Sequence, residues 1–226
     1  MIELRNISKT YPNGTEAVKN VTLHIKPGEF VSLVGRSGTG KTTLVKMIVA
    51  EEKPTDGKII LGGWDITRIR QADIPMLRRQ IGVVFQDYKL LPQKTVFENV
   101  AFALEVAGYS KKHITDVVPQ ILALVGLEAK AKEFPDELSG GQQERVSIAR
   151  ALAHRPKILI ADEPTGNLDS INTREIIDLL LKINNFKTTV MLVTHNREVV
   201  NSLRKRVIAI EDGKIVYDEE KGRYVL

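Results

Sequence analysis

A glycine-rich stretch that ends in a lysine and two threonines has the clearest chemistry in the sequence. It comprises Gly35, Arg36, Ser37, Gly38, Thr39, Gly40, Lys41, Thr42 and Thr43. This spacing fits the phosphate-binding P-loop, in which curled backbone lets several N–H groups point at one anion. Lys41 is placed to reach the outer phosphates of a nucleotide, and the Thr42 hydroxyl to ligate Mg2+. A plain glycine turn before a helix is the alternative, which the apolar run at 30–34 disfavours.

Two adjacent carboxylates follow a second apolar run. Asp162 and Glu163 come directly after residues 158–161, which have the continuous apolar character of a buried parallel strand. Ligands of open α/β sheets bind at the carboxyl ends of such strands. We expect Asp162 to hold Mg2+ and Glu163 to act as a general base on the attacking water. A solvated acidic strand end is the alternative, and the P-loop weighs against it.

Two further polar side chains end predicted strands. His195 follows the apolar run 189–193, and Gln86 follows the run 81–85. A lone histidine is usually structural, but at this strand end His195 is expected near the γ-phosphate. Gln86 is expected to contact Mg2+ or the attacking water, although by itself it would indicate nothing.

A second anion-binding element precedes a predicted helix. It comprises Ser139, Gly140, Gly141 and Gln142, and the free N–H groups of the following helical turn favour an anion. A serine that only caps its helix is the alternative. Because the P-loop already holds one nucleotide, we expect this element to face the ATP of another subunit.

The pattern of the whole chain predicts an α/β fold. Alternating strands are expected at 2–7 and 21–25, with further strands at 58–61 and near Trp64, in a small antiparallel sheet. Parallel strands alternate with helices elsewhere, including a helix after 139–141 that reaches His154 and one over about 174–184. Residues 207–210 and 214–217 are expected to form a hairpin. We expect a single domain over 1–226, in which 1–86 and 139–226 form the core and about 87–138 a helical insertion.

The order of these motifs resembles that of ATP-binding-cassette (ABC) ATPases over nearly the whole chain. The resemblance implies a head-to-tail homodimer with two ATP molecules, each between the P-loop of one chain and residues 138–142 of the other. It implies that Tyr11 stacks on adenine, that Asp169 couples the two sites, and that Glu163 and His195 are the catalytic base and the switch histidine. Glu144, Arg36 and Thr39 depart from the usual family pattern.

A narrower resemblance is to the cell-division subfamily of these ATPases, the FtsE proteins. It rests on residues 85–106, 135–138 and the tail near 218–219; residues 161–169 fit as well but are shared with exporters. The subfamily implies an FtsX-like membrane partner and, through it, an extracellular peptidoglycan hydrolase. The ATPase of a lipoprotein-release or macrolide exporter is one alternative, and a non-transport cassette acting on nucleic acid is another.

Composition limits where such a protein works. The 226 residues carry a net charge of +5, are 42% hydrophobic and include no cysteine, which suits the cytosol. No run approaches the roughly 18 apolar residues of a membrane span, so a partner must supply any transmembrane part. The resemblance to FtsE proteins implies a peripheral protein on the cytoplasmic face of the membrane, at the division site. Basic clusters near 68–79 and 204–206 are expected to be solvated, and no nucleic acid is expected to bind.

Overall fold

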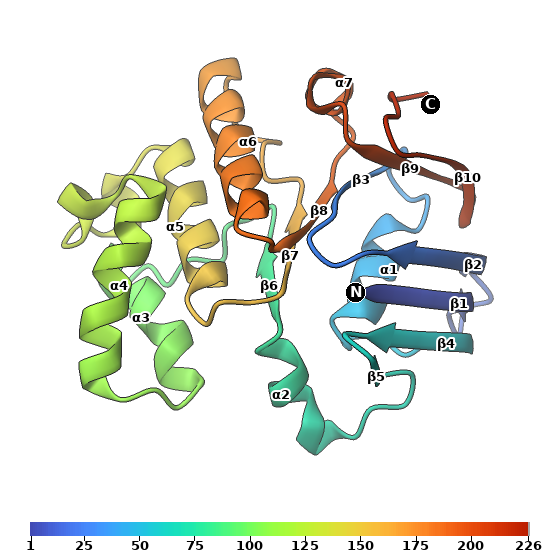
Figure 1. Ribbon diagram of the computed structural model, residues 1–226, viewed down its shortest axis with the longest axis horizontal. Coiled ribbons are helices and arrows are strands. Elements are labelled where there is room, and N and C mark those ends of the chain that lie inside the picture. Colours follow the sequence, from blue (N-terminus) through green and yellow to red (C-terminus); the bar gives the residue numbers. More distant parts are fainter. Residues whose placement is uncertain (226) are drawn as a thin grey trace.

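Two β-sheets stand side by side in the computed structural model, which describes residues 1–225 (Figure 1). The antiparallel sheet has the order β2-β1-β4-β5, with β1 Ile2–Thr10, β2 Glu16–Ile25, β4 Asp56–Leu61 and β5 Trp64–Asp65. The larger sheet has the order β10-β9-β3-β8-β7-β6. Its strands are β3 Phe30–Val34, β6 Ile81–Val84, β7 Ile158–Asp162, β8 Thr189–Val193, β9 Arg206–Glu211 and β10 Lys214–Glu219. Only β10 runs antiparallel within it.

Helices cover both faces of the larger sheet. They are α1 Lys41–Ile48, α2 Ile74–Arg78, α3 Val96–Val106, α4 Lys111–Val125, α5 Gly140–Leu152, α6 Ser170–Asn185 and α7 Arg197–Leu203. Short 3-10 turns lie at η1 Gln71–Asp73, η2 Glu128–Lys130 and η3 Pro135–Glu137. Helices α3, α4 and α5 lie on the side of the molecule opposite the antiparallel sheet (Figure 1).

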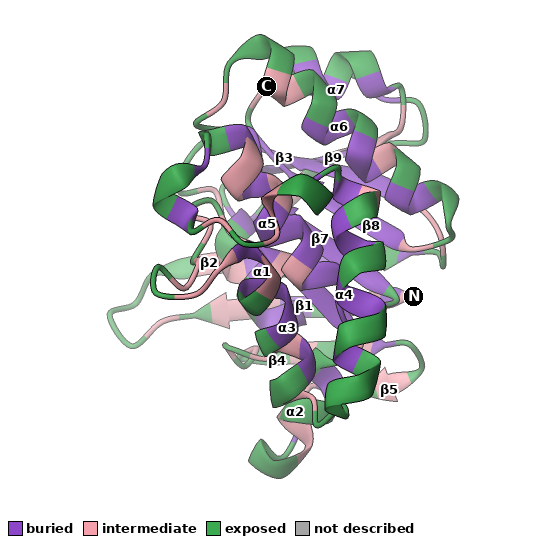
Figure 2. Cartoon of the chain, turned by 90° about the vertical axis from the view of Figure 1, so that its left-hand side faces the viewer, coloured by how far each residue is buried: buried purple, intermediate pink, exposed green. Residues whose placement is uncertain are grey.

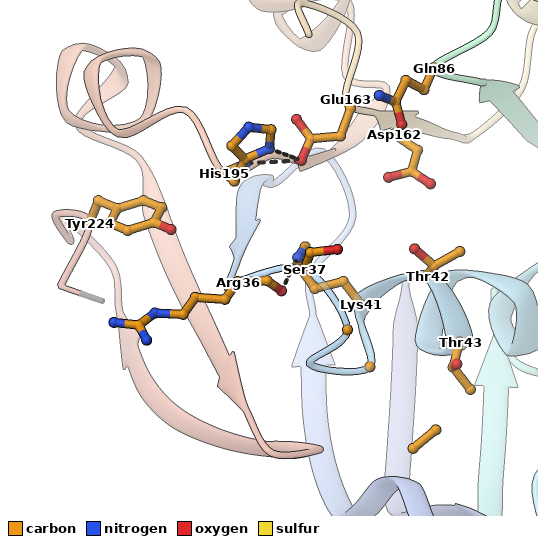
Figure 3. A pocket seen from close by; sticks show the side chains of 13 residues that line it. Arg36, Ser37, Lys41, Thr42, Thr43, Gln86, Asp162, Glu163, His195 and Tyr224 are labelled. Carbon is orange, nitrogen blue, oxygen red and sulfur yellow. Dashed lines mark hydrogen bonds and ion pairs between the residues drawn. The ribbon is translucent and has the colours of Figure 1, made fainter. Parts of the chain in front are cut away.

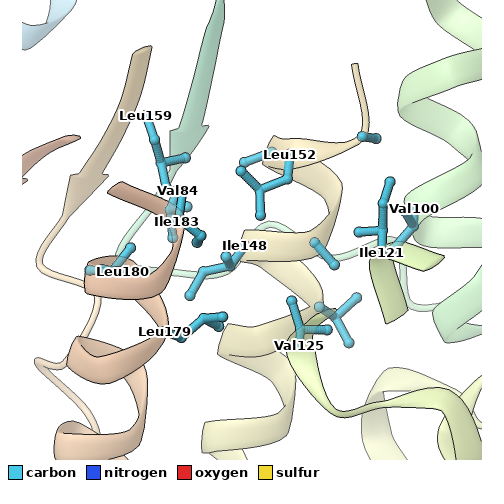
Figure 4. Close-up of a cluster of buried hydrophobic side chains, with 14 of the residues drawn as sticks. Val84, Val100, Ile121, Val125, Ile148, Leu152, Leu159, Leu179, Leu180 and Ile183 are labelled. Carbon is cyan, nitrogen blue, oxygen red and sulfur yellow. The ribbon is translucent and has the colours of Figure 1, made fainter. Parts of the chain in front are cut away.

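The parallel strands are apolar because each of them separates two hydrophobic cores. Along β7, Leu159 and Ala161 join the core under α5 and α6, whereas Ile158 and Ile160 join the core shared with α1 and the antiparallel sheet. Side chains that alternate across a strand explain this division. Figure 2 shows the inner strands almost wholly buried, and Figure 4 shows Ile148, Leu152, Leu180 and Ile183 packed on Leu159 and Val84.

Local signals set the helix ends. Thr95 and Glu98 form a capping box at the start of α3, and Ser139 and Gln142 form another at the start of α5. Gly126, with φ of 72°, ends α4 in the left-handed conformation that glycine adopts easily. Each cap satisfies backbone groups that the end of a helix leaves unpaired.

The predicted α/β fold is confirmed, with differences at element ends. The strand predicted to include Phe85 ends at Val84, and the helix predicted from about residue 174 begins at Ser170, where Asp169 caps it. The helix expected to reach His154 ends at Leu152, and β1 and β2 are longer than predicted. Helices α2 and α7 were not predicted; both are short, so neither shows a long apolar period.

Candidate active site

The carboxyl ends of β3, β7 and β8 meet at one edge of the sheet and open into a cavity of about 550 Å3 (Figure 3). The side chains predicted to contact phosphate or metal come together here from separate parts of the chain. The lining residues are Ala17, Arg36, Ser37, Gly38, Gly40, Lys41, Thr42, Thr43, Gln86, Asp162, Glu163, His195 and Tyr224.

The loop between β3 and α1 requires glycine at its last position. Gly40 has a φ of 104°, and a Cβ atom there would collide with the carbonyl oxygen of Ala17. Gly40 is also the N-cap of α1 and offers no side chain to the first-turn N–H groups. Those donors therefore remain available to an anion in the cavity, together with the positive end of the helix dipole.

Lys41 is folded back onto its own loop. Its Nζ donates hydrogen bonds to the carbonyl oxygens of Gly35 at 2.7 Å and Arg36 at 2.8 Å. Burial lowers the pKa of Lys41, and the nearby carboxylates of Glu163 and Asp162 oppose that shift. A phosphate in the cavity would offer this ammonium a full negative charge in place of two neutral carbonyls.

Glu163 and His195 are in direct contact. Glu163 Oε1 lies 2.6 Å from His195 Nδ1 and accepts a hydrogen bond from the His195 backbone N–H at 3.0 Å (Figure 3). The Thr194 hydroxyl donates to Oε2 at 3.2 Å. The Glu163 side chain is only 13% exposed and that of His195 is 65% exposed. The two strand ends thus hold a shielded carboxylate beside an imidazole that faces the opening.

Asp162, Thr42 and Gln86 bring three oxygen-bearing side chains to the same cavity. Burial, followed by the charge of Glu163, raises the pKa of Asp162 above its ordinary value, while Lys41 opposes the shift. Within residues 1–225 no cluster of three His, Cys, Asp or Glu side chains forms a complete metal site. Mg2+ bound to a nucleotide needs only one or two protein carboxylates or hydroxyls, so this donor set fits it.

Two tyrosines lie near the P-loop, and only Tyr11 was predicted there. Tyr11 does not line the cavity; its hydroxyl lies 3.3 Å from Thr43 Oγ1, and Lys9 Nζ lies 5.1 Å from its ring centre. Tyr224 lines the cavity and was not predicted. It packs against the apolar cluster of Val34, Val200, Val207 and Ala209. The sequence carries no signal for Tyr224, because only the folded tail brings it to the P-loop.

The predicted second phosphate site lies outside this cavity. Ser139 Oγ accepts a hydrogen bond from the Gln142 backbone N–H at 3.4 Å, and Gln142 Oε1 accepts from the Ser139 N–H at 2.9 Å. Asp169 caps α6 through the N–H groups of Ile171 and Asn172, at 2.9 Å each. Ser139 and Gly140 are exposed, so the start of α5 faces solvent rather than the chain's own P-loop.

Glu144 lies one turn further along α5 and is fully buried. Neither carboxyl oxygen has a hydrogen-bond partner among the described residues. Burial raises the pKa of Glu144 to about 8, so this carboxyl is mostly protonated at neutral pH.

Comparisons with known proteins agree with this geometry. The family model described as ABC transporter matches residues 18–166. The cell division ATP-binding protein FtsE of Bacillus subtilis is 55% identical over 224 residues, 99% of this chain and 98% of that protein. The protein of the same name from Escherichia coli K12 is 45% identical over 215 residues, 95% of this chain and 97% of that protein.

A solved structure extends the agreement to the fold. The dimeric ATP-binding cassette MJ0796, in a post-hydrolysis state bound to ADP and Pi, matches with a TM-score of 0.88 and 37% identity. The match covers 99% of this chain and 100% of that one. With the P-loop, the acidic strand end and the histidine gathered at one sheet edge, these matches show that the chain belongs to the ABC transporter family and is an FtsE-like ATP-binding cassette ATPase.

Proposed function

We propose that this chain is the ATP-hydrolysing subunit of a cell-division complex of the FtsE type. In this complex, ATP-driven homodimerisation acts on an FtsX-like membrane protein, which in turn controls an extracellular peptidoglycan hydrolase. The observation that carries the proposal is the 45–55% identity to FtsE proteins over 95–99% of the chain. These matches cover nearly the whole chain rather than the ATP site alone.

ATP binding is assigned to the P-loop and the start of α1. Lys41 would exchange its two carbonyl partners for the β- and γ-phosphates, while backbone N–H groups of residues 35–43 would surround these phosphates. Thr42, Gln86 and Asp162 would hold Mg2+, which when bound neutralises the charge that develops on the phosphates. The Tyr11 hydroxyl lies 3.3 Å from Thr43 Oγ1, and its ring would stack on adenine beside the P-loop.

Hydrolysis is assigned to Glu163 as general base. Its carboxylate is held by His195 and Thr194, so it is already oriented before ATP binds. His195 would turn toward the γ-phosphate when the nucleotide enters, because that anion competes with Glu163 for its imidazole. Gln86 would orient the attacking water or complete the metal site.

A second copy would complete each ATP site. Ser139, Gly140, Gly141 and Gln142 start α5 in solvent, away from the chain's own cavity, which fits a phosphate site that serves a partner. Asp169 lies at the start of α6, and Asn172 in the first turn of this helix is close to Gly141 of α5. A movement of the start of α5 would therefore be transmitted to the start of α6. Dimeric structures of a similar cassette support this assembly.

The membrane partner would bind the groove beside α3, which we call the docking groove. Its apolar lining includes Phe85, Phe102 and Val106, and Arg78, Arg79 and Lys89 add positive charge. The loop that carries Gln86 connects the two sites. Gln86 lines the ATP cavity, whereas its neighbours Phe85 and Lys89 line the docking groove. We propose that residues about 87–138 act as a helical subdomain that moves with this partner, at the cytoplasmic face of the membrane.

The test is co-purification from solubilised membranes. A Glu163→Gln chain with ATP and Mg2+ should recover an FtsX-like membrane protein, and an added Phe102→Asp should abolish the recovery. Phe134→Asp is the matched control, because Phe134 is 41% exposed against 38% for Phe102 and does not line the groove. Recovery of an exporter instead would overturn the cell-division assignment and leave the ATP-site assignments intact.

A further inference from the structure

A second apolar groove lies at the amino-terminal edge of the parallel sheet, and we call it the basal groove. It has a volume of about 680 Å3 and is lined by Val117, Ile121 and Leu124 of α4, Leu152 of α5, and Ile183 and Phe186 at the end of α6. Lys157 and Thr188, which precede β7 and β8, also line it. The ATP cavity is at the other ends of these strands, so the two sites lie on opposite edges of one sheet.

Three cations stand around the apolar lining. Arg155, Lys157 and Lys187 line the basal groove and are exposed. None of the three forms an ion pair within the described residues. No carboxylate lines the groove. Its electrostatic character is therefore positive, and a ligand with negative charge beside apolar groups would complement it.

The shape of the groove suits a helical segment. Val117, Gln120, Ile121 and Leu124 of α4 line the groove at positions i, i+3, i+4 and i+7, so the groove follows one face of α4 for about two turns. Phe186 is 67% exposed and offers a large apolar contact. An amphipathic helix places apolar side chains into such a groove at positions i, i+3, i+4 and i+7. Its polar face then lies beside the rim.

Other occupants fit less well. A second copy in a two-fold contact would bring the basic rims against each other. A flat lipid surface would contact Phe186 but would not enter the basal groove as far as Val117, Ile121 and Leu152, which are only 7–9% exposed.

We infer that the basal groove binds an acidic amphipathic helix of another protein. The site is separate from the docking groove, and the inference does not depend on the proposed membrane partner. Because α4 and α6 both line it, such a helix would bridge the segment ahead of α5 and the sheet core without touching the ATP cavity.

The test uses a labelled helical peptide with leucine at positions i, i+3, i+4 and i+7 and glutamate on its other face. Fluorescence anisotropy should show saturable binding to the full chain, weakening as salt is raised. Lys187→Glu and Phe186→Ala should each weaken binding at least tenfold. Lys182→Glu is the matched control, since Lys182 is exposed on α6 and does not line the groove.

Three results would overturn the inference. They are equal binding of a peptide with lysine in place of each glutamate, equal weakening by Lys182→Glu, and no saturable binding of the acidic peptide. Binding of phosphatidylglycerol vesicles that depends on Lys187, without peptide binding, would assign the surface to lipid instead. The ATPase rate of each variant should match that of the unaltered chain, because the groove is at the far edge of the sheet; a lowered rate would show that the change has disturbed the fold.

Discussion

At the scale of single residues, the groups assigned to ATP are occupied by other parts of the chain. Lys41 donates to the carbonyls of Gly35 and Arg36, and Glu163 is in contact with His195. These partners keep buried polar groups satisfied when no phosphate is present. ATP therefore has to replace these hydrogen bonds within the chain by hydrogen bonds to its phosphates. Its affinity depends on the difference in free energy between the contacts within the chain and the contacts with ATP.

Glu144 gives the clearest pH dependence. Its pKa of about 8 lies above the value near 4.3 of an unfolded glutamate, so the folded chain holds an extra proton between these values. The contribution of Glu144 to the free energy of unfolding is therefore complete below pH 4 and is lost as pH rises toward 8. The free energy of unfolding falls by at most about 1.4 kcal/mol per pH unit in this range. We predict that Glu144→Gln removes this slope and raises the melting temperature at pH 7–8.

The measurement is thermal unfolding of both chains between pH 5 and 8.5. Glu105→Gln is the control, because Glu105 is exposed on α3 and should leave the pH profile unchanged. Identical profiles for Glu144→Gln and the unaltered chain would show that the carboxyl reaches solvent or a charged partner.

At the scale of elements, the loop after β6 is fixed at two places. Arg150 of α5 donates to the carbonyls of Tyr88 at 2.7 Å and Lys89 at 2.6 Å. Asn99 of α3 is fully buried and hydrogen-bonds backbone groups of Leu91, Lys94 and Thr95. The loop carrying Gln86 is thus attached to α5 and to α3, which links the ATP cavity to the docking groove.

We predict that Asn99→Ala destabilises the chain by about 2 kcal/mol, because it leaves several buried backbone groups without partners. Urea unfolding measures this. Asn185→Ala should change stability by less than about 0.5 kcal/mol, since Asn185 is exposed at the end of α6. Equal effects of the two substitutions would mean that the Asn99 hydrogen bonds contribute nothing net.

The sequence predicted those elements whose signal is local. The apolar runs of β3, β7 and β8 have no polar alternation, and Ser139 and Gly126 mark helix ends directly. The P-loop, Asp162, Glu163, His195 and Gln86 were likewise predictable, because each one follows a strand. Tyr224 and the Lys41 carbonyl contacts were not, since they depend on how distant segments pack.

At the scale of the whole molecule, one parallel sheet separates the proposed surfaces. The cavity assigned to ATP is at its carboxyl edge, the basal groove is at its amino edge, and the docking groove lies beside α3 and α5. Within the described residues no helix is long and apolar enough to cross a membrane. Because the three sites lie at different places around the sheet, substitutions in one site can be tested without altering side chains that line the others.

The central claim is that two chains enclose ATP and that Glu163 then activates the water. The start of α5 lies outside the chain's own cavity, so on the proposed mechanism one chain supplies only part of this site. Removing the base without changing its shape should halt hydrolysis and preserve the enclosed state.

The most direct measurement is light scattering together with turnover for Glu163→Gln in ATP and Mg2+. We predict a particle of twice the 25.3 kDa chain mass and a rate lowered by about 10²–10⁴-fold. Glu211→Gln, an exposed control at the end of β9, should keep the normal rate. A Glu163→Gln chain that stays monomeric in ATP, or that hydrolyses ATP at the normal rate, would contradict the account.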